Sequence, residues 1–369
     1  MNAALEAREI TIGYGRRSRH QSIVASGLNL KLARGELVCL IGPNGVGKST
    51  LLRSLAGLQP LLAGSLLADS KNLFDLDLRS RARMIGVVLT DRIDVGILSA
   101  FDLVALGRHA HTGWAGKLSA EDRSVVLWAL RQVDAERLGG RNVAELSDGE
   151  RQKLLIARAL AQQPSIIVLD EPTAYLDLPR RIEMMGLLRR LAHSTGRSVV
   201  FSTHDLDLAI GSADLMWLMN NRGEPQIGAP EDLILGGEIA AAFVGEGVEF
   251  DALDGSFRLT ASPRGTAIVD GAGLGYAWTK RALERDGFRV ADSPNPELTV
   301  RVTGTGNQFS WSVAKQRVHG RGGEEPEKVV SAAGVDELGE VVFNSIYDLI
   351  SAVRRERRDD APTPDPKPI

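Results

Sequence analysis

GPNGVGKST, residues 42–50, fits the pattern G-x-x-x-x-G-K-[ST] of a loop that binds phosphate groups. It stands between a short apolar run, LVCLI at residues 37–41, and the helix-like stretch TLLRSLAG. Glycines in such a loop let backbone N–H groups turn toward phosphate oxygens, and the N-terminus of the following helix adds a favourable dipole. The alternative is an ordinary glycine-rich turn. The strand and helix on either side favour a phosphate site in an α/β domain.

Two side chains of this loop, Lys48 and Ser49, are expected to contact the ligand. Lys48 is expected to reach the β- and γ-phosphates of a nucleotide, and the hydroxyl of Ser49 is expected to bind Mg²⁺. Gly42, Gly45 and Gly47 are needed because the backbone must wrap closely around the phosphates.

A second apolar run, SIIVLDEPT at residues 165–173, ends in Asp170 and Glu171. A carboxylate at the carboxyl end of a parallel strand can hold Mg²⁺, directly or through water, and the next carboxylate can orient or deprotonate an attacking water. By itself the pair could also be a solvated loop. Beside an intact phosphate loop, we expect Asp170 to bind the metal and Glu171 to act as the base.

The stretch LSDGE, residues 146–150, precedes an evident helix. Ser147 is a good N-cap residue, and Asp148 and Glu150 suit the positive end of a helix. The same helix start is also a place where an anion can bind. Helix capping and phosphate binding are therefore both open to this segment.

Composition limits the classes of function. The chain has 369 residues, of which 43% are hydrophobic and 25% charged, so it can bury a sizeable core and leans toward two domains. A formal net charge of −3 gives no whole-chain case for binding nucleic acid. Its single cysteine, Cys39, lies in an apolar run and is expected to be a buried structural thiol. No spanning helix or signal peptide is evident, which predicts a soluble, cytoplasmic protein.

The pattern of apolar residues divides the chain into parts. Up to about residue 240, short β-branched runs alternate with helical stretches, which predicts a mostly parallel sheet flanked by helices. We expect this α/β domain over residues 1–245, with a helical subdomain at about 91–160. Residues 246–358 are expected to form a small α+β domain, and the Pro-rich tail 359–369 a disordered end.

The expected α+β domain begins with a hairpin, VEFDALDGSFRLT, that turns at Asp254-Gly255. A strand at TAIVD, a helix at YAWTKRALERDG, strands near ELTVRV and FSWSVA, and a closing helix around VVFNSIYDLISAVRRE follow. The glycines at 271, 273 and 275 lack dinucleotide-loop spacing, which favours a tight turn. Trp278-Thr279, expected to be exposed, could contact a ligand or pack internally.

The motifs GPNGVGKST, LSDGERQ, IIVLDEPT, AYLD and STHD, in this order, resemble the nucleotide-binding subunit of ATP-binding cassette (ABC) transporters over roughly residues 5–240. The resemblance implies a P-loop NTPase cassette that binds ATP and Mg²⁺. It makes LSDGE the signature motif, Asp170-Glu171 the Walker B pair, Asp177 the D-loop aspartate and Tyr14 a stacking partner for adenine, unless that tyrosine is a plain core or surface residue. The Walker A loop that holds the nucleotide would be Gly42, Pro43, Asn44, Gly45, Val46, Gly47, Lys48, Ser49 and Thr50.

The resemblance also implies a dimer. In this family ATP is sandwiched between two subunits facing head to tail, so Ser147 and Gly149 of one chain would lie at the γ-phosphate bound by the other. His204, in STHD, would be the histidine that senses the γ-phosphate. A lone histidine after a strand is otherwise more often structural.

Three departures from the family pattern stand out. The signature usually reads LSGGQ, but here it carries Asp148 and Glu150, and a carboxylate near a γ-phosphate is repulsive unless it points at backbone N–H groups. The glutamine that usually joins Mg²⁺ to the helical subdomain is absent, and Thr90 or Asp91 stands in its place. The D-loop reads AYLD rather than the commoner SALD, a mild change.

The stretch LSAFDLVALGRHAHTGW, residues 98–114, resembles the permease-facing segment of importers of iron–siderophore complexes, heme and cobalamin. Read without the family, it is an amphipathic helix with Phe101, Leu103, Val104 and Leu106 in the core. The importer reading implies a membrane permease as partner, indirectly a substrate-binding protein, and a place at the cytoplasmic face of the membrane. The alternatives are a soluble cassette ATPase of translation or DNA repair, an exporter subunit or a catalytically weak binding module. We expect the C-terminal domain to regulate the ATPase or stabilise its dimer.

Overall fold

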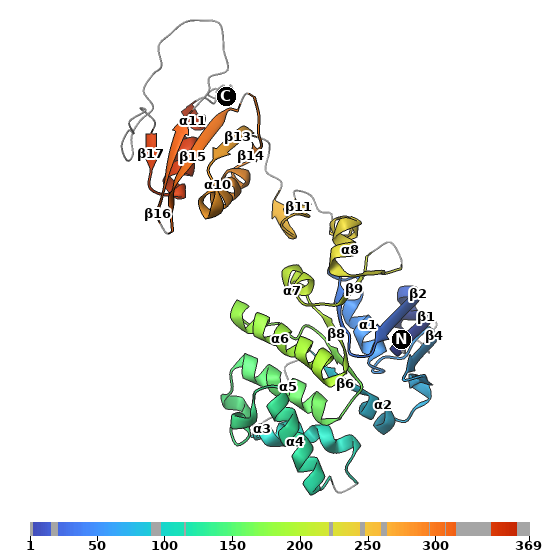
Figure 1. The fold of residues 1–369 in the computed structure, drawn as a ribbon. Helices are drawn as coiled ribbons and strands as arrows, with labels where there is room; N and C mark the ends of the chain where they lie inside the picture. The colour runs from blue at the N-terminus through green and yellow to red at the C-terminus, as the bar shows by residue number, and fades with distance from the viewer. Residues whose placement is uncertain are drawn as a thin grey trace, which may run out of the picture. The chain divides into compact units, whose positions relative to one another are not determined.

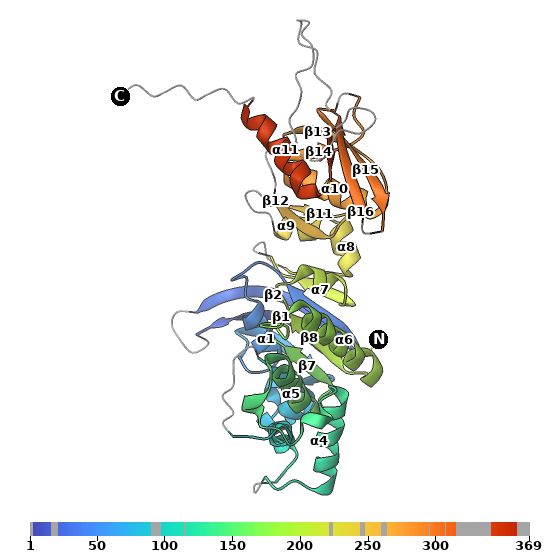
Figure 2. The same cartoon turned by 90° about the vertical axis from the view of Figure 1, so that its left-hand side faces the viewer.

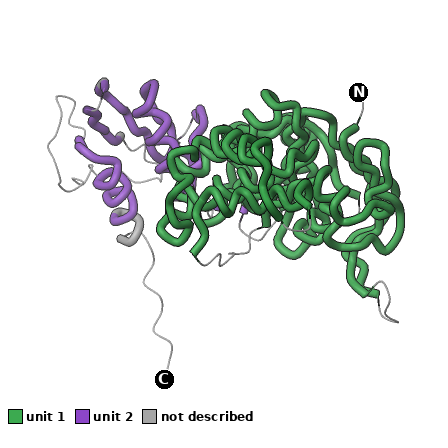
Figure 3. The backbone as a smooth tube through the Cα atoms, turned by 90° about the horizontal axis from the view of Figure 1, so that it is seen from below, with its two compact units in different colours: residues 1–244, 250–257 green, residues 245–249, 258–369 purple. Residues whose placement is uncertain are grey.

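A computed structural model describes residues 3–15, 21–89, 97–113, 116–220, 224–243, 248–259, 264–294, 296–306, 308–314 and 341–359. Contacts between residues divide the chain into two units, residues 1–244 with 250–257, and residues 245–249 with 258–369 (Figure 3). This division differs from the expected boundary at residue 245, because most of the hairpin packs with the first unit. Among the described helices, none combines the length and the apolar character needed to cross a membrane.

The first unit is organised around a six-stranded sheet in the order β10-β9-β3-β8-β7-β6. Its strands are β3 (Leu37–Ile41), β6 (Ile85–Val88), β7 (Ile166–Leu169), β8 (Ser198–Ser202), β9 (Leu215–Leu218) and β10 (Gln226–Gly228). All neighbours are parallel except β10, which runs antiparallel to β9. Every residue of β3, β7 and β8 is buried, as a sheet covered on both faces requires. The carboxyl ends of these three strands therefore lie next to one another.

Cys39, in β3, is fully buried, and burial raises the pKa of its thiol. A thiol in this environment stays protonated and inert. This agrees with the expected structural role.

A second, antiparallel sheet in the order β2-β1-β4-β5 adds to this unit and was not foreseen from the sequence. It consists of β1 (Ala3–Tyr14), β2 (Ser22–Ala33), β4 (Ala63–Ala68) and β5 (Lys71–Asn72). Its buried residues share one apolar cluster with helix α1 (Lys48–Leu55) and with one face of the parallel sheet. The phosphate loop thus opens a helix that is held between two sheets.

The helical subdomain consists of α3 (Ala100–Ala105), the 3₁₀ helix η2 (Leu106–Ala110), α4 (Ala120–Gln132) and α5 (Asp148–Ala161). Helices α3, α4 and α5 lie together in Figure 1, and α4 and α5 are again neighbours in Figure 2. Leu103 and Val104 are fully buried, and Phe101 packs against the core. Leu106, which the amphipathic-helix alternative placed in the core, is 43% exposed. It follows the buried Val104 by two residues, which puts it on the opposite side of a helix.

The remaining helices of the first unit surround the sheet. They are α2 (Leu78–Met84), α6 (Leu178–Thr195), α7 (Leu206–Ile210), α8 (Pro230–Leu235) and α9 (Glu238–Ala242). Short 3₁₀ helices cover Leu73–Asp75, Glu136–Leu138 and Val143–Glu145.

The predicted hairpin is present as β11 (Val248–Asp251) and β12 (Ser256–Leu259). The expected two-residue turn at Asp254-Gly255 is not formed: the loop spans residues 252–255, and only its last residue, Gly255, has a positive φ, of 65°. The Asp251 carboxylate accepts hydrogen bonds from the backbone N–H groups of Leu253 and Asp254 and so holds this longer loop. The Phe257 ring lies 5.5 Å from Phe243 and 5.1 Å from Phe250, and Phe243 and Phe250 pack against the main core of the first unit. These three rings fix the hairpin to the cassette.

The second unit is a five-stranded sheet in the order β14-β13-β15-β16-β17, drawn in orange and red in Figure 1. Its elements are β13 (Gly265–Asp270), α10 (Gly273–Arg285), β14 (Phe288–Val290), β15 (Leu298–Thr305), β16 (Gln308–Ala314), β17 (Val341–Phe343) and α11 (Ile346–Asp359). β13 pairs in parallel with β14 and β15, whereas β16 pairs antiparallel with β15 and β17. The predicted α+β character is therefore present.

Two expectations for this unit were wrong. The closing helix begins at Ile346, because VVF forms strand β17 and Ser345 exchanges hydrogen bonds with Asp348 at the helix start. Trp278 is 56% exposed, but Thr279 is fully buried; its hydroxyl donates to Gly275 O and accepts from Trp311 Nε1 at 2.7 Å. Thr279 is thus a packing residue. The predicted disordered tail lies, apart from Asp359, outside the described residues.

Candidate active site

The phosphate loop follows β3 directly, and two of its glycines are required by space. A Cβ on Gly42 would lie 2.4 Å from the carbonyl oxygen of Met219, and a Cβ on Gly47, whose φ is 105°, would lie 2.3 Å from Val24. Gly47 caps helix α1 without a side-chain hydrogen bond. The backbone N–H groups at the start of α1 therefore have no capping side chain and suit an anionic ligand.

Lys48 is held inside this loop, with a relative exposure of 7%. Its Nζ donates to Gly42 O at 2.8 Å and to Pro43 O at 3.0 Å. Burial lowers the pKa of Lys48, while the charges of Glu171 and Asp170 act in the opposite direction. Carbonyl oxygens of the loop thus hold the ammonium group of Lys48 near two carboxylates, in a position that suits binding of a phosphate.

Asp170 stands at the end of β7 and is 6% exposed. Its Oδ1 accepts a hydrogen bond from Ser49 Oγ at 3.4 Å and from Ser202 Oγ at 2.7 Å. The structure therefore brings together the two side chains that the sequence assigned to Mg²⁺, although 121 residues separate them.

Glu171 faces the predicted switch histidine. Its Oε1 lies 2.6 Å from His204 Nε2, and both side chains are partly exposed to solvent. Glu171 has φ of 49°, an uncommon backbone conformation for a residue other than glycine. The expected base and the expected γ-phosphate sensor thus form one hydrogen-bonded pair.

The oxygens of Ser49 and Asp170 fit a magnesium ion. Neighbouring ligands of an octahedral Mg²⁺ lie about 3 Å apart, which is close to the 3.4 Å between these two oxygens. Among the described residues, no group of three or more His, Cys, Asp or Glu side chains could hold a metal. A hydroxyl and a carboxylate oxygen are the hard ligands that Mg²⁺ takes, and this ion often binds through one or two such groups together with waters and substrate phosphates. Thr90 and Asp91 lie outside the described residues.

The hydrogen bonds of LSDGE, residues 146–150, here called the signature segment, show where its two carboxylates, Asp148 and Glu150, are directed. Glu150 Oε2 accepts from Ser147 N at 3.0 Å and from Ser147 Oγ at 2.8 Å, and Glu150 N donates to Ser147 Oγ at 3.4 Å. This is a capping box. The hydrogen bonds from the Ser147 backbone and hydroxyl lower the pKa of Glu150. Its carboxylate therefore points at a backbone N–H, whereas Asp148 is exposed and lies 4.0 Å from Arg151.

The remaining predicted residues have local partners. Tyr14, at the end of β1, is 52% exposed, and its hydroxyl lies 3.0 Å from Thr50 Oγ1 in the first turn of α1. Asp177 caps helix α6 by accepting from Arg180 N at 3.0 Å. A Cβ on Gly149 would lie 3.7 Å from Leu176, so the signature segment and the D-loop are neighbours.

Ser202 belongs to this site but was not predicted from the sequence. It is the last residue of β8, is fully buried, and hydrogen-bonds both to Asp170 and to the backbone of Glu171. The available signal was its place at the end of a buried strand, two residues before His204.

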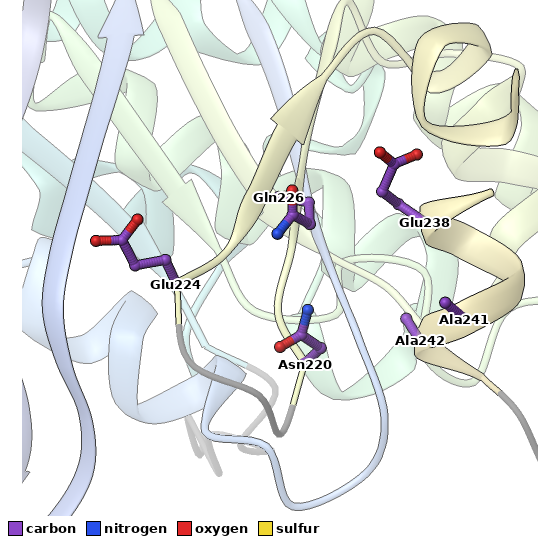
Figure 4. Close-up of a pocket in the computed structure, with 6 residues that line it drawn as sticks. All are labelled: Asn220, Glu224, Gln226, Glu238, Ala241 and Ala242. Carbon is purple, nitrogen blue, oxygen red and sulfur yellow. The ribbon is translucent and has the colours of Figure 1, made fainter. Parts of the chain in front are cut away.

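A cavity of about 350 Å³ lies beside β10 and α9 (Figure 4). It is lined by Asn220, Glu224, Gln226, Glu238, Ala241 and Ala242. None of these was predicted to bind nucleotide or metal, so the cavity and the candidate nucleotide site share no residue.

Two family profiles match the chain. The ABC transporter family matches residues 25–174, and the iron ABC transporter C-terminal domain matches residues 264–321. The second match covers much of the second unit, from β13 to beyond β16.

Known proteins similar to this chain agree with these matches. An uncharacterized ABC transporter ATP-binding protein of Methanocaldococcus jannaschii is 37% identical over 274 residues, which are 73% of this chain and 93% of that one. The iron(3+)-hydroxamate import ATP-binding protein of Bacillus subtilis is 34% identical over 56% of this chain and 75% of its own length. A dimeric bacterial ABC transporter cassette superposes with a TM-score of 0.53 at 29% identity, covering 61% of this chain and 98% of that one.

The order of the motifs, the convergence of their side chains at one edge of the sheet and these similarities lead to one conclusion. The chain belongs to the ATP-binding subunits of ABC transporters, the family of cassettes that hydrolyse ATP to power transport.

Proposed function

We propose that this chain is the Mg²⁺-dependent ATPase subunit of an importer that takes up iron chelates. One observation supports the ATPase activity. At the carboxyl ends of β3, β7 and β8, four side chains lie close together: Lys48, Asp170, Glu171 and His204. In open α/β sheets this edge is where ligands bind.

The side chains divide the reaction between them. Lys48 and the N–H groups of the loop bind the β- and γ-phosphates, and Ser49 and Asp170 hold Mg²⁺, which neutralises charge on the phosphates. Glu171 accepts the proton of the attacking water, and His204, hydrogen-bonded to Glu171, lies in place to contact the γ-phosphate. Tyr14 stacks on the adenine.

Hydrolysis is proposed to require two copies of the chain. Ser147 and Gly149 of one copy complete the site formed by Lys48 of the other, and Asp177 lies at the same interface. The dimeric cassette that superposes on this chain supports this arrangement.

The cargo is inferred from the second unit and from one relative. Residues 264–321 match a domain described for iron ABC transporters, and the B. subtilis relative is named for iron(3+)-hydroxamate import. We expect a ferric chelate, with heme and cobalamin as the competing cargoes. The second unit is proposed to regulate the ATPase or to stabilise the dimer.

The permease is proposed to dock on the segment around α3. Ile97 is 92% exposed and Leu106 is 43% exposed there, while Leu103 and Val104 anchor the helix in the core. Exposed apolar side chains on either side of a firmly packed helix suit a protein partner. Docking on a permease would place the chain at the cytoplasmic face of the membrane, with a substrate-binding protein as an indirect partner.

Two experiments test this function. An epitope-tagged Glu171→Gln variant, loaded with ATP, is purified from detergent-extracted membranes of its host, and co-purifying proteins are identified by mass spectrometry. We expect a permease with many membrane spans to co-purify. A smaller amount of it should co-purify when the bait also carries the Ile97→Asp and Leu106→Asp substitutions. Uptake of ⁵⁵Fe-labelled chelate, heme and cobalamin by cells lacking the gene then identifies the cargo. Recovery of only ribosomal or DNA-associated proteins would refute the importer, and loss of cobalamin or heme uptake alone would refute the iron chelate.

A further inference from the structure

Ser202 links the carboxylate of Asp170 to the backbone of Glu171 through one hydroxyl group. Its Oγ donates to Asp170 Oδ1 at 2.7 Å and accepts from the backbone N–H of Glu171 at 3.0 Å. The residue is fully buried. A buried hydroxyl has few alternative partners, so both bonds are fixed features of the folded chain.

The sheet explains why Ser202 reaches both residues. β7 and β8 run in parallel with Leu169 opposite Phe201, so the residues that follow, Asp170 and Ser202, leave the sheet side by side. Glu171 comes next, where the chain turns with φ of 49°. An uncommon conformation of this kind persists only where its surroundings hold it, and the bond to Ser202 is one such restraint.

We propose that Ser202 is a positioning residue that sets Asp170 for Mg²⁺ and sets the backbone of Glu171 so that its carboxylate meets His204. This inference rests on the proposed magnesium site. Ser202 is fully buried, and its hydroxyl is bonded to Asp170 and to Glu171. It acts through Asp170, whose oxygen it orients, and through Glu171, whose main chain it restrains.

The chain supplies a matched control in Ser198, the first residue of the same strand. Ser198 is also fully buried, and among the described residues its hydroxyl has no hydrogen-bond partner. Ser198→Ala therefore makes the same chemical change in the same strand, away from the carboxylates. Ser202→Thr retains the hydroxyl and serves as the conservative variant.

The test measures the Mg²⁺ dependence of binding separately from turnover. Binding of a fluorescent ATP analogue is titrated with Mg²⁺ for the wild type and for Ser202→Ala, Ser202→Thr and Ser198→Ala, and kcat and KM are measured with the same proteins. For Ser202→Ala we expect the Mg²⁺ concentration at half-maximal binding to rise at least threefold and kcat to fall at least tenfold. Ser198→Ala is expected to match the wild type, and Ser202→Thr to recover part of both losses.

The outcomes separate this inference from the proposal on which it rests. If ATP binding by the wild type does not depend on Mg²⁺, the magnesium site fails. If it does, and a folded Ser202→Ala matches Ser198→Ala in Mg²⁺ dependence and kcat, the role of Ser202 is overturned. Should Ser202→Ala not fold, Ser202→Cys replaces it, because a thiol of similar size is a weaker donor; an unchanged Mg²⁺ titration for that variant overturns the inference equally.

Discussion

His204 Nε2 lies 2.6 Å from Glu171 Oε1, although 33 residues separate them in the chain. Strands β7 and β8 are neighbours, and the residues that follow them leave the same edge of the sheet. The pair places a hydrogen-bonding imidazole against the carboxylate expected to activate water.

Glu171→Gln removes the proton acceptor while keeping the size of the side chain. We expect ATP binding within about threefold of the wild type and a kcat lower by roughly 10²–10⁴-fold, the range of general-base catalysis. Steady-state ATPase assays with a parallel nucleotide-binding titration check this. Turnover at the wild-type rate would exclude Glu171 as the base.

Glu150→Gln tests the carboxylate of the signature segment. Glutamine can still accept from Ser147 in a capping box, so the helix start is retained, but the negative charge is removed. The carboxylate of Glu150 already points at the backbone N–H of Ser147, so we expect little repulsion from it. The protein concentration at which Glu150→Gln/Glu171→Gln forms its ATP-bound dimer should therefore differ by less than about threefold from that of Glu171→Gln.

Sedimentation velocity with ATP measures this difference, and Glu145→Gln/Glu171→Gln is its control. Glu145 is an exposed carboxylate in the preceding turn, so its removal changes net charge without touching Ser147. A dimer of Glu150→Gln/Glu171→Gln that forms at a roughly tenfold lower concentration than that of Glu145→Gln/Glu171→Gln would contradict this, because it would show that the charge of Glu150 reaches the triphosphate.

The ion pair inside the helical subdomain predicts a pH effect on stability. Arg108 Nε donates to Asp122 Oδ1 at 2.9 Å, and Arg108 Nη1 donates to Ala161 O at 2.7 Å. Hydrogen bonds from the Ser119 backbone and hydroxyl, and then from Arg108, lower the pKa of Asp122 from its usual 3.8 to about 2. A carboxyl group with a lowered pKa stabilises the fold above pH 4, and this contribution is lost as the pH falls toward 2.

For Asp122→Asn we expect a loss of about 3 kcal/mol at pH 7, because Arg108 remains buried without its anion. The difference from the wild type should shrink between pH 4 and pH 2. Urea unfolding across this range checks the prediction, with Glu121→Gln, an exposed neighbour, as control. A difference that stays constant with pH would contradict it.

The aromatic cluster of the hairpin predicts where the chain can be shortened. A chain ending at residue 259 keeps Phe243, Phe250 and Phe257 together, whereas one ending at residue 246 removes two of the three rings. We expect the longer form to unfold at the temperature of the full chain's first unit. The shorter form should melt several degrees lower, because loss of about 2 kcal/mol of ring burial lowers Tm by a few degrees in a domain of this size.

Differential scanning calorimetry of both forms checks this, and ATPase assays of the longer form test the second unit. Unchanged ATPase activity and unchanged dimerisation without residues 260–369 would refute the proposed regulatory or dimer-stabilising role.

Much of the candidate site could be predicted from sequence because its chemistry is local. The phosphate loop needs glycine next to lysine and serine, and β3 was predicted with its exact limits, Leu37–Ile41. The amphipathic-helix alternative was wrong for Leu106, because this residue lies two positions past the buried Val104 and such positions face opposite sides of a helix. The antiparallel sheet was missed, although β1 pairs with the next strand, β2. It also pairs β1 with β4, more than fifty residues away, and no local pattern encodes such pairing.

The sequence by itself determined the class of the chain and the identity of its phosphate-binding residues, since backbone freedom, charge and hydroxyl groups reside in single residues. Tertiary structure decided the relationships between them. Parallel pairing of β7 with β8 brought Ser202 to Asp170 and Glu171, whereas the contact of Glu150 with Ser147 is local to one helix start. Tertiary packing also attached the hairpin to the cassette, because three phenylalanine rings bury more apolar surface together than apart.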